Sequence, residues 1–207
     1  MSGSGHAEIP HVTKNTPHGG KTERSVEFDD KGNLSRLRLD TDQDGHMDTF
    51  QYSEDGVLIR IERDTDADRH VDTVDYFEKG RRTRQKERDK DGNLFQEVIF
   101  DANQQVTRIR KDTIADGRLD TTYLFEKGRI VRVVKDTTGD GITNIQEIYQ
   151  EGKPHERRED LDGDGVIEQI ITFDIAGIPV ENALDTDKDG YMDTFRTYQN
   201  NMLVALE

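Results

Sequence analysis

The chain has 207 residues and a formal net charge of -15; 35% of its residues are charged, only 7% are aromatic, and none is Trp. This composition does not favour a thick globular core. The excess of 44 acidic over 29 basic residues favours cation binding and argues against a nucleic-acid partner, whose groove would need clustered Lys and Arg. Cysteine is absent, which excludes disulfides and thiol chemistry. No apolar run approaches the roughly 20 residues of a transmembrane helix.

The start of the chain carries Pro10, Pro17 and the pair Gly19-Gly20, so we expect residues 1–24 to form a flexible leader. Its first residues, MSGSGHAEIP, contain no apolar signal-peptide core, and the Ser-Gly start resembles a cloning remnant or the leader of a processed protein. If the protein is exported, its signal or lipid anchor is expected to lie outside this sequence. Residues 25–207 are expected to form a single repeat domain.

An aspartate-rich motif recurs along the chain with spacings of 23 to 25 residues. The unit reads D-T-D-x-D-G-x-x-D-T, followed by an alternating run, a short turn with Gly or Asn, and a second alternating run. A repeat of this length is one supersecondary element, so it dictates the architecture. The first aspartates of the motif are Asp40, Asp64, Asp89, Asp112, Asp136, Asp160 and Asp185.

Apolar and polar residues alternate in both runs of the unit, which is typical of β-strands. In the second run, for example, Ile59 and Ile61 are expected on one face and Arg60 on the other. Gly and Asn accept the positive φ of tight turns, so each unit is predicted to be a β-hairpin. An additional hairpin over residues 25–39 brings the total to eight hairpins.

A single hairpin is only marginally stable, so the units must share their apolar faces with their neighbours. We therefore predict an all-β fold in which tandem β-hairpin repeats of about 24 residues form one continuous antiparallel sheet, coiled or spiral like a solenoid.

The aspartate motif matches the ligand spacing of an EF-hand-type calcium loop. In such a loop, side chains ligate from positions 1, 3, 5 and 9, position 7 ligates through its carbonyl, and position 6 is Gly. Four loops are complete at the side-chain positions: Asp40, Asp42, Asp44, Asp48; Asp64, Asp66, Asp68, Asp72; Asp160, Asp162, Asp164, Glu168; and Asp185, Asp187, Asp189, Asp193. Their position-7 residues are His46, His70, Val166 and Tyr191. Arg69 replaces the position-6 Gly of the second loop and is expected to strain it.

Three further loops are degraded. The loop at Asp112 has Ile114 at position 3, although Asp116 and Asp120 remain. The loop at Asp136 retains Asp140 and Asn144, and it places Glu147 at position 12, where a bidentate carboxylate belongs. The segment DKDGN at Asp89 is about two residues too short, so it is predicted to be a plain turn.

Two interpretations of these loops compete. Asp, Asn and Gly also build tight turns without any metal. Turns do not require four carboxylates at one point, however, and such a cluster repels itself when empty. Ligation by oxygen alone favours Ca²⁺ over Zn²⁺ or copper. We therefore expect about four to six Ca²⁺ ions, each adding two charges, which would change the net charge from -15 to between -7 and -3.

Strands rather than helices are expected to flank the loops, which argues against a helical EF-hand pair. The loop sequences DLDGDGVIEQI and DTDKDGYMDTF resemble those of thrombospondin type 3, dockerin and FG-GAP/VCBS proteins. The turn sequences FDDKGNLSRL, FDANQQVTRI and LFEKGRIVRV resemble the YD (Rhs-type) and MORN-like hairpin repeats of bacterial surface proteins. The resemblance covers residues 25–207 and implies a bacterial surface repeat protein. FG-GAP blades are longer, four-stranded units, so the 24-residue period argues against a propeller.

No metalloprotease HExxH motif, phosphate-binding Gly-rich loop or Ser nucleophile elbow is present, so we do not expect an enzyme. The first hypothesis is a calcium-binding structural protein of the cell surface or periplasm: a spacer, adhesin segment or matrix component. Calcium outside the cytoplasm is millimolar and would fill even weak loops. The second hypothesis is a binding module, preorganised by calcium, for a glycan, polyanion or surface protein.

Arginines recur at one position of the second run and are expected on one sheet face, where they would bind a polyanion or pair with acids across strands. Exposed edge strands would also permit self-association. The recurring arginines are Arg36, Arg60, Arg108 and Arg132.

Overall fold

The computed structural model describes residues 14–18, 21–200 and 202–207, with side chains described from residue 23 onward. The described residues contain no helix, so none of them forms a helix that could span a membrane. The chain divides into two compact units, one ending at Asn93 and the other comprising Leu94–Glu207. Each unit is described separately.

The first unit is an antiparallel meander in which each strand pairs with the next one along the chain. Alternating residues form the strands because the side-chain period of a β-strand is two. The strands are β1 (Lys14–His18), β2 (Lys21–Phe28), β3 (Leu34–Leu39), β4 (Thr49–Glu54), β5 (Val57–Arg63), β6 (Thr73–Glu78) and β7 (Arg81–Arg88).

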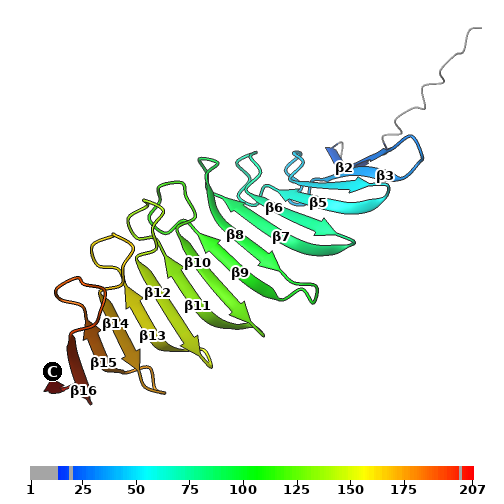
Figure 1. Ribbon diagram of the computed structural model, residues 1–207. Coiled ribbons are helices and arrows are strands. Elements are labelled where there is room, and N and C mark those ends of the chain that lie inside the picture. Colours follow the sequence, from blue (N-terminus) through cyan, green and yellow to red (C-terminus); the bar gives the residue numbers. More distant parts are fainter. Residues whose placement is uncertain (1–13, 19–20, 201) are drawn as a thin grey trace, which may run out of the picture. The chain divides into compact units, whose positions relative to one another are not determined.

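The second unit repeats this arrangement over ten strands. Its strands lie side by side, with hairpin turns at one end and longer loops at the other (Figure 1). They are β8 (Leu94–Phe100), β9 (Val106–Lys111), β10 (Thr121–Glu126), β11 (Arg129–Lys135), β12 (Ile145–Gln150), β13 (Lys153–Glu159), β14 (Gln169–Phe173), β15 (Pro179–Leu184), β16 (Thr194–Gln199) and β17 (Met202–Leu206). The predicted all-β fold of antiparallel hairpin repeats is confirmed.

The hairpins close through two kinds of turn. In one kind, two consecutive residues have positive φ, as in a type I′ turn; Asp55 has φ 47° and Gly56 has φ 78°. In the other kind, an Asp carboxylate caps the turn: Asp29 Oδ1 accepts hydrogen bonds from the N–H groups of Lys31 and Asn33. Asp89 makes the same bonds to Asp91 and Asn93, so the prediction of a plain turn there is confirmed.

Sheet structure begins earlier than the sequence predicts. Strand β1 lies inside residues 1–24, the expected flexible leader, and β2 starts at Lys21 rather than at Ser25. The edge of β2 offers backbone groups with which β1 pairs, and Pro17 is tolerated because it follows an irregularity in this pairing. Residues 1–13 and 19–20 of the expected leader lie outside the described residues.

Few side chains are deeply buried, as expected for a chain without a thick core. Val133 is 1% exposed because it lies between Tyr123 and Glu147 of the two neighbouring strands. Ile61 is 9% exposed, whereas Ile59, expected on the same apolar face, is 39% exposed. Ile59 lies close to the hairpin turn, where the pairing of β4 and β5 is interrupted by a bulge. Burial of a strand side chain therefore depends on having a paired strand on both sides.

Candidate metal centres

Six long loops connect one hairpin to the next, and they share one backbone conformation. Each loop has positive φ at its fourth and sixth residues. The glycines at position 6 accept this conformation, as expected. The positive φ at position 4 was not anticipated, although Gly139 and Gly163 at that position signal it. The residues at position 4 are Gln43, Ala67, Ala115, Gly139, Gly163 and Lys188.

Backbone N–H groups hold the loop carboxylates in place. In the first loop, Asp40 Oδ2 accepts from the N–H of Gly45 at 2.9 Å, and Asp48 Oδ2 accepts from the N–H of Thr41 at 2.6 Å. Position 5 accepts from the N–H of position 7, as Asp44 does from His46 at 2.7 Å. These bonds recur in the other loops. Asp160 and Asp185 accept N–H groups through both oxygens, whereas Oδ1 of Asp40, Asp48 and Asp64 has no donor within the described residues.

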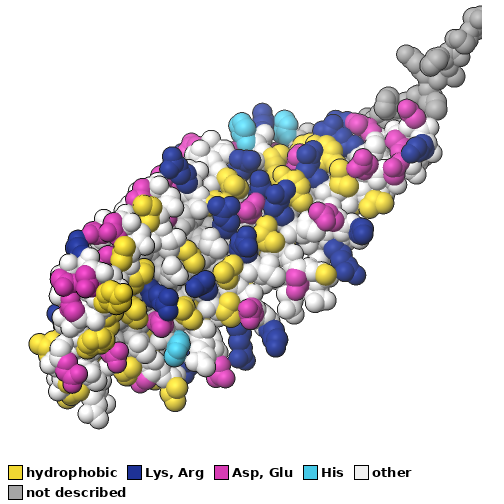
Figure 2. Space-filling view, in the orientation of Figure 1, with side chains coloured by type: hydrophobic (Ala, Val, Ile, Leu, Met, Phe, Trp, Pro, Cys, Tyr) yellow, Lys and Arg dark blue, Asp and Glu magenta, His cyan; other side chains and the backbone are white. Residues whose placement is uncertain are grey.

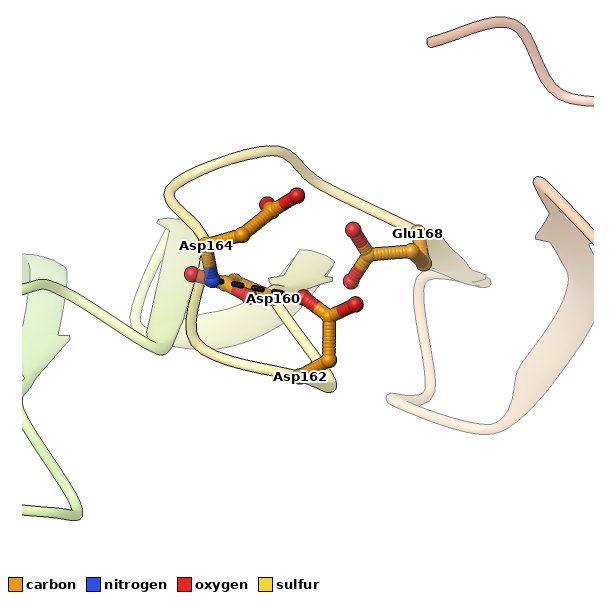
Figure 3. A group of neighbouring side chains, drawn as sticks. All are labelled: Asp160, Asp162, Asp164 and Glu168. Carbon is orange, nitrogen blue, oxygen red and sulfur yellow. Dashed lines mark hydrogen bonds between the residues drawn. The ribbon is translucent and has the colours of Figure 1, made fainter. Parts of the chain in front are cut away.

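Carboxylates come together in five of the loops, in groups whose ligand atoms all lie within 4.8 Å of one another. The largest group has four members, which converge on the inside of one loop (Figure 3). Such groups could hold a metal ion. The groups are Asp160, Asp162, Asp164 and Glu168; Asp40, Asp42 and Asp48; Asp64, Asp66 and Asp72; Asp112, Asp116 and Asp120; and Asp185, Asp187 and Asp193.

The first loop contains a buried carboxylate oxygen without a hydrogen-bond partner. Asp40 is 6% exposed, and its Oδ1 has no donor within the described residues, nor has Oδ1 of Asp64 at the same position of the second loop. Leaving a buried acceptor unsatisfied costs about 1–3 kcal/mol, and more when it is charged. A cation bound in each of these two loops would satisfy Oδ1 of Asp40 and Oδ1 of Asp64.

The fit to the EF-hand pattern is incomplete at position 5. Asp164 and Asp116 belong to their groups, whereas Asp44, Asp68 and Asp189 do not. In all five residues Oδ1 accepts the N–H of position 7, so this bond does not distinguish the two sets.

The loop at Asp136 brings together fewer carboxylates than the others. Asp136 accepts from the N–H groups of Gly139 and Gly141, and the Asn144 amide oxygen takes the role that a carboxylate has elsewhere. Glu147, expected as the bidentate ligand, lies within β12 instead. Its Oε1 accepts from Lys135 Nζ at 3.1 Å, and its Oε2 accepts from the Tyr149 hydroxyl at 3.0 Å. The charged Lys135 beside it on β11 accounts for this different pairing.

The position-7 residues place their N–H groups on the position-5 carboxylates. The His46 imidazole contacts the Arg69 guanidinium at 2.9 Å, and His70 Nδ1 lies 3.3 Å from Asp68. Val166 and Tyr191 have exposed side chains. Neither imidazole belongs to a carboxylate group within the described residues. Ligation through the carbonyl of position 7 remains a prediction.

Hydrogen bonds keep several loop carboxylates ionised. The N–H of Thr186, followed by its hydroxyl, lowers the pKa of Asp193 below its ordinary value. Burial acts to raise the pKa of Asp48, but hydrogen bonds from Thr41 and Thr49 outweigh it, and the pKa is lowered. These two carboxylates therefore carry negative charge at neutral pH, which favours a cation beside them.

Successive loops also contact each other within each unit. Arg69 reaches His46 of the preceding loop, and Arg118 Nη1 donates to the carbonyl of Gly139 in the following loop at 2.9 Å. Lys188 forms an ion pair with Asp162, and this hydrogen bond is the main cause of the lowered pKa of Asp162. Basic residues thus neutralise part of the charge at the loop end of the strands.

No family model and no curated protein matches the chain. Similar solved structures include accessory secretory protein 1,2 and 3 of Streptococcus pneumoniae, with 17% identity over 63% of this chain and 23% of that chain, and a TM-score of 0.34. A TcdB2-TccC3-Cdc42 structure has 13% identity, covers 84% of this chain and 13% of that chain, and has a TM-score of 0.24. A porin-like protein from Bacteroides uniformis ATCC 8492 has 11% identity over 87% of this chain and 84% of that chain, and a TM-score of 0.21. The chain spans about a quarter of the length of the first structure. Similarities this low carry no argument about function.

Proposed function

We propose that the protein is a calcium-binding structural repeat protein of the cell surface or periplasm, serving as a spacer, adhesin segment or matrix component. The observation that carries the proposal is the buried, unpartnered Oδ1 of Asp40 within a group of three carboxylates. An empty group of this kind is unfavourable, whereas a bound cation would stabilise it.

Calcium fits the donor set better than other metals. The groups consist of carboxylates, and the chain has no cysteine. Hard oxygen ligands select Ca²⁺ or Mg²⁺ over Zn²⁺ and copper. Loops with several irregularly placed carboxylates suit the flexible coordination of Ca²⁺ more than the strict octahedron of Mg²⁺.

The position of the loops explains what the ions would do. Each long loop joins the last strand of one hairpin to the first strand of the next. An ion bound there would fix the connection between repeats and reduce the repulsion of a chain that carries a net charge of -15. Weak sites would be filled where calcium is millimolar, which favours a location outside the cytoplasm. Coiling of the whole array like a solenoid remains a prediction.

A thermal melt followed by far-UV circular dichroism tests this proposal. We expect the melting temperature in about 5 mM CaCl₂ to exceed that in EDTA by at least about 5 °C, because a site filled at 100 times its dissociation constant contributes about 2.7 kcal/mol. MgCl₂ at the same concentration should have a smaller effect. An unchanged melting temperature would show that the aspartates only build turns.

Matched variants locate the effect in the loops. The double variant Asp160→Asn with Glu168→Gln should lose part of the calcium-dependent increase, because it removes two of the four carboxylates of the largest group. Asp174→Asn is the control, since Asp174 caps a hairpin turn through the N–H groups of Ala176 and Ile178. Equal calcium responses in both variants would contradict the assignment.

A second candidate function rests on a row of alternating Arg and Tyr in the first unit. Cross-strand pairing aligns Arg36, Tyr52, Arg60, Tyr76 and Arg84 on one face. The Arg60 guanidinium lies 4.2 Å from the Tyr52 ring centroid, and that of Arg84 lies 4.4 Å from Tyr76. Lys and Arg side chains gather over the strands of this unit (Figure 2). Arg60 also forms an ion pair with Glu62 at 3.1 Å, which neutralises part of the row. The arginines between aromatic rings nevertheless favour an anionic glycan or another polyanion over a cationic partner.

An array of anionic saccharides, probed with and without Ca²⁺, tests the second candidate. Binding should be lost on combining Arg36→Ala with Arg60→Ala and retained on combining Lys79→Ala with Lys90→Ala, which removes the same charge from the turns. If no saccharide binds either with or without Ca²⁺, the second candidate is refuted and the structural role is the one that remains.

A further inference from the structure

The fourth residue of a long loop lies close to the carboxylates of the loop before it. In the second unit, a Cβ added at Gly139 would lie 2.8 Å from Asp116 Oδ2, although the two residues belong to successive loops. A Cβ added at Gly163 would lie 4.0 Å from Asp140 Oδ2, again in the preceding loop. A side chain at position 4 is therefore placed beside the acidic residues of its neighbouring loop.

Among the six position-4 residues of the described loops, Lys188 alone is charged. Its backbone N–H donates to Asp185 Oδ1 at 2.7 Å, which fixes Lys188 in its own loop. Its ammonium group reaches back to the preceding loop and forms an ion pair with Asp162 Oδ2. Asp162 belongs to the largest carboxylate group, in which its carboxylate and that of Glu168 point toward each other (Figure 3). A positive charge is therefore already seated at the group.

The ammonium group interacts with more than one carboxylate of this group. Its hydrogen bond to Asp162 is the largest cause of the raised pKa of Lys188, and the charges of Glu168 and Asp164 raise that pKa further. Three of the four carboxylates of the group thus share the charge of one lysine. The side chains of Lys188 and Asp162 are 59% and 35% exposed, so the ammonium group can move into water without leaving a buried charge unpaired.

We propose that Lys188 competes with the metal ion for the carboxylate group of the Asp160 loop and thereby lowers the calcium affinity of that loop. An ion that takes Asp162 as a ligand displaces the ammonium group, and the displaced positive charge continues to repel the ion from close by. The inference rests on the proposed calcium function. It adds that the calcium affinity of one loop is controlled by a side chain of the next loop along the chain.

The first unit has the same arrangement without the charge. Ala67 occupies position 4 of the second loop, and its φ of 63° is close to the 61° of Lys188. It lines the same cavity as Asp42 and Asp48, which belong to the carboxylate group of the first loop. A lysine introduced at Ala67 should therefore act on the first loop as Lys188 acts on the Asp160 loop.

A tryptophan at position 7 reports on one loop at a time, because the chain has no Trp of its own. Val166→Trp places it in the Asp160 loop, at a residue that is 43% exposed. The indole sensitises the luminescence of Tb³⁺ bound in that loop, and displacement of Tb³⁺ by CaCl₂ gives the calcium dissociation constant. Adding Lys188→Gln should lower this constant at least about threefold at low ionic strength, because it removes a unit charge near a divalent ion. NaCl should reduce the difference by screening.

The matched control is Lys153→Gln in the same Val166→Trp chain. It removes the same charge from the same unit, but Lys153 Nζ donates to the carbonyl of Ile175 at 2.8 Å rather than to a loop carboxylate. It should leave the dissociation constant unchanged. The reverse experiment adds Ala67→Lys to a chain with His46→Trp, which reports on the first loop, and should raise the dissociation constant of that loop at least about threefold.

The outcomes separate this inference from the calcium function itself. An unchanged dissociation constant in Lys188→Gln, an equal change in Lys153→Gln, or no effect of Ala67→Lys would overturn the role of position 4 while calcium binding stands. A Val166→Trp chain that shows no Tb³⁺ luminescence reversible by Ca²⁺, whichever residue is at position 188, would refute metal binding in the Asp160 loop and this inference with it.

Discussion

Arg69 has a backbone conformation that the other long loops assign to Gly. Its φ is 75°, and the corresponding residues are Gly45, Gly117, Gly141, Gly165 and Gly190. A side chain in this left-handed region costs about 1–2 kcal/mol. Arg69→Gly should therefore raise the free energy of unfolding by about 1 kcal/mol, measured by urea denaturation in EDTA, since among the described residues its side chain contacts His46 at an exposed site and little else is lost.

The reverse change supplies the control. Gly190 has φ 90° and open space around the position of an added Cβ. Gly190→Ala should lower the free energy of unfolding by about 1 kcal/mol through backbone strain alone. If Arg69→Gly were destabilising, the side chain of Arg69 would have to contribute more than its conformation costs.

Asp75 is the most deeply buried acid of the described residues. It is 2% exposed, and its two oxygens accept from Arg63 at 2.6 Å and from Arg82 at 3.2 Å, on the strands to either side. Both arginines are partly exposed, so the arrangement is screened by solvent on one side. Asp75→Ala should lower the free energy of unfolding by about 2 kcal/mol, measured by urea denaturation. A comparable loss for Asp91→Ala, whose ion pair with Lys90 is exposed, would contradict this account.

At the scale of the element, the short turns make stability depend on pH. The N–H of Asn93 is the largest cause of the lowered pKa of Asp89, and the Asn33 side chain is the largest cause of the lowered pKa of Asp29. A carboxyl group whose pKa is lowered on folding stabilises the fold above its unfolded pKa, near 3.9, and loses that contribution as the pH falls through the lowered value. The melting temperature in EDTA should therefore decrease as the pH falls below about 4.

The variant Asp89→Asn isolates the contribution of one turn. Asn also caps turns but does not titrate, so the variant should lose less stability between neutral and acidic pH than the original chain. Asp91→Asn is the control because Asp91 is exposed and contacts only Lys90 through its side chain. Identical pH profiles for Asp89→Asn and the original chain would show that this turn does not contribute.

At the scale of the whole molecule, net charge opposes folding. A chain with a charge of -15 repels itself, and added salt screens exposed charges separated by more than the Debye length, about 10 Å at 0.1 M. The melting temperature in EDTA should therefore rise with NaCl concentration. With CaCl₂ present the rise should be smaller, because bound ions neutralise carboxylates directly. A melting temperature that falls with salt in EDTA would indicate that ion pairs outweigh repulsion.

The sequence by itself determined the hairpins, their period and the aspartate loops, because these features are local. A turn such as Asp89–Asn93 is defined by residues within five positions, and the loop groups by carboxylates within nine. Tertiary structure decided what depends on neighbouring strands. Glu147 pairs with Lys135 of β11, Asp75 is buried between β5 and β7, and β1 extends the sheet into the expected leader. A strand side chain is buried in this fold where its strand is paired on both sides, so residues with the same local pattern, such as Val133 and Leu206, differ completely in exposure.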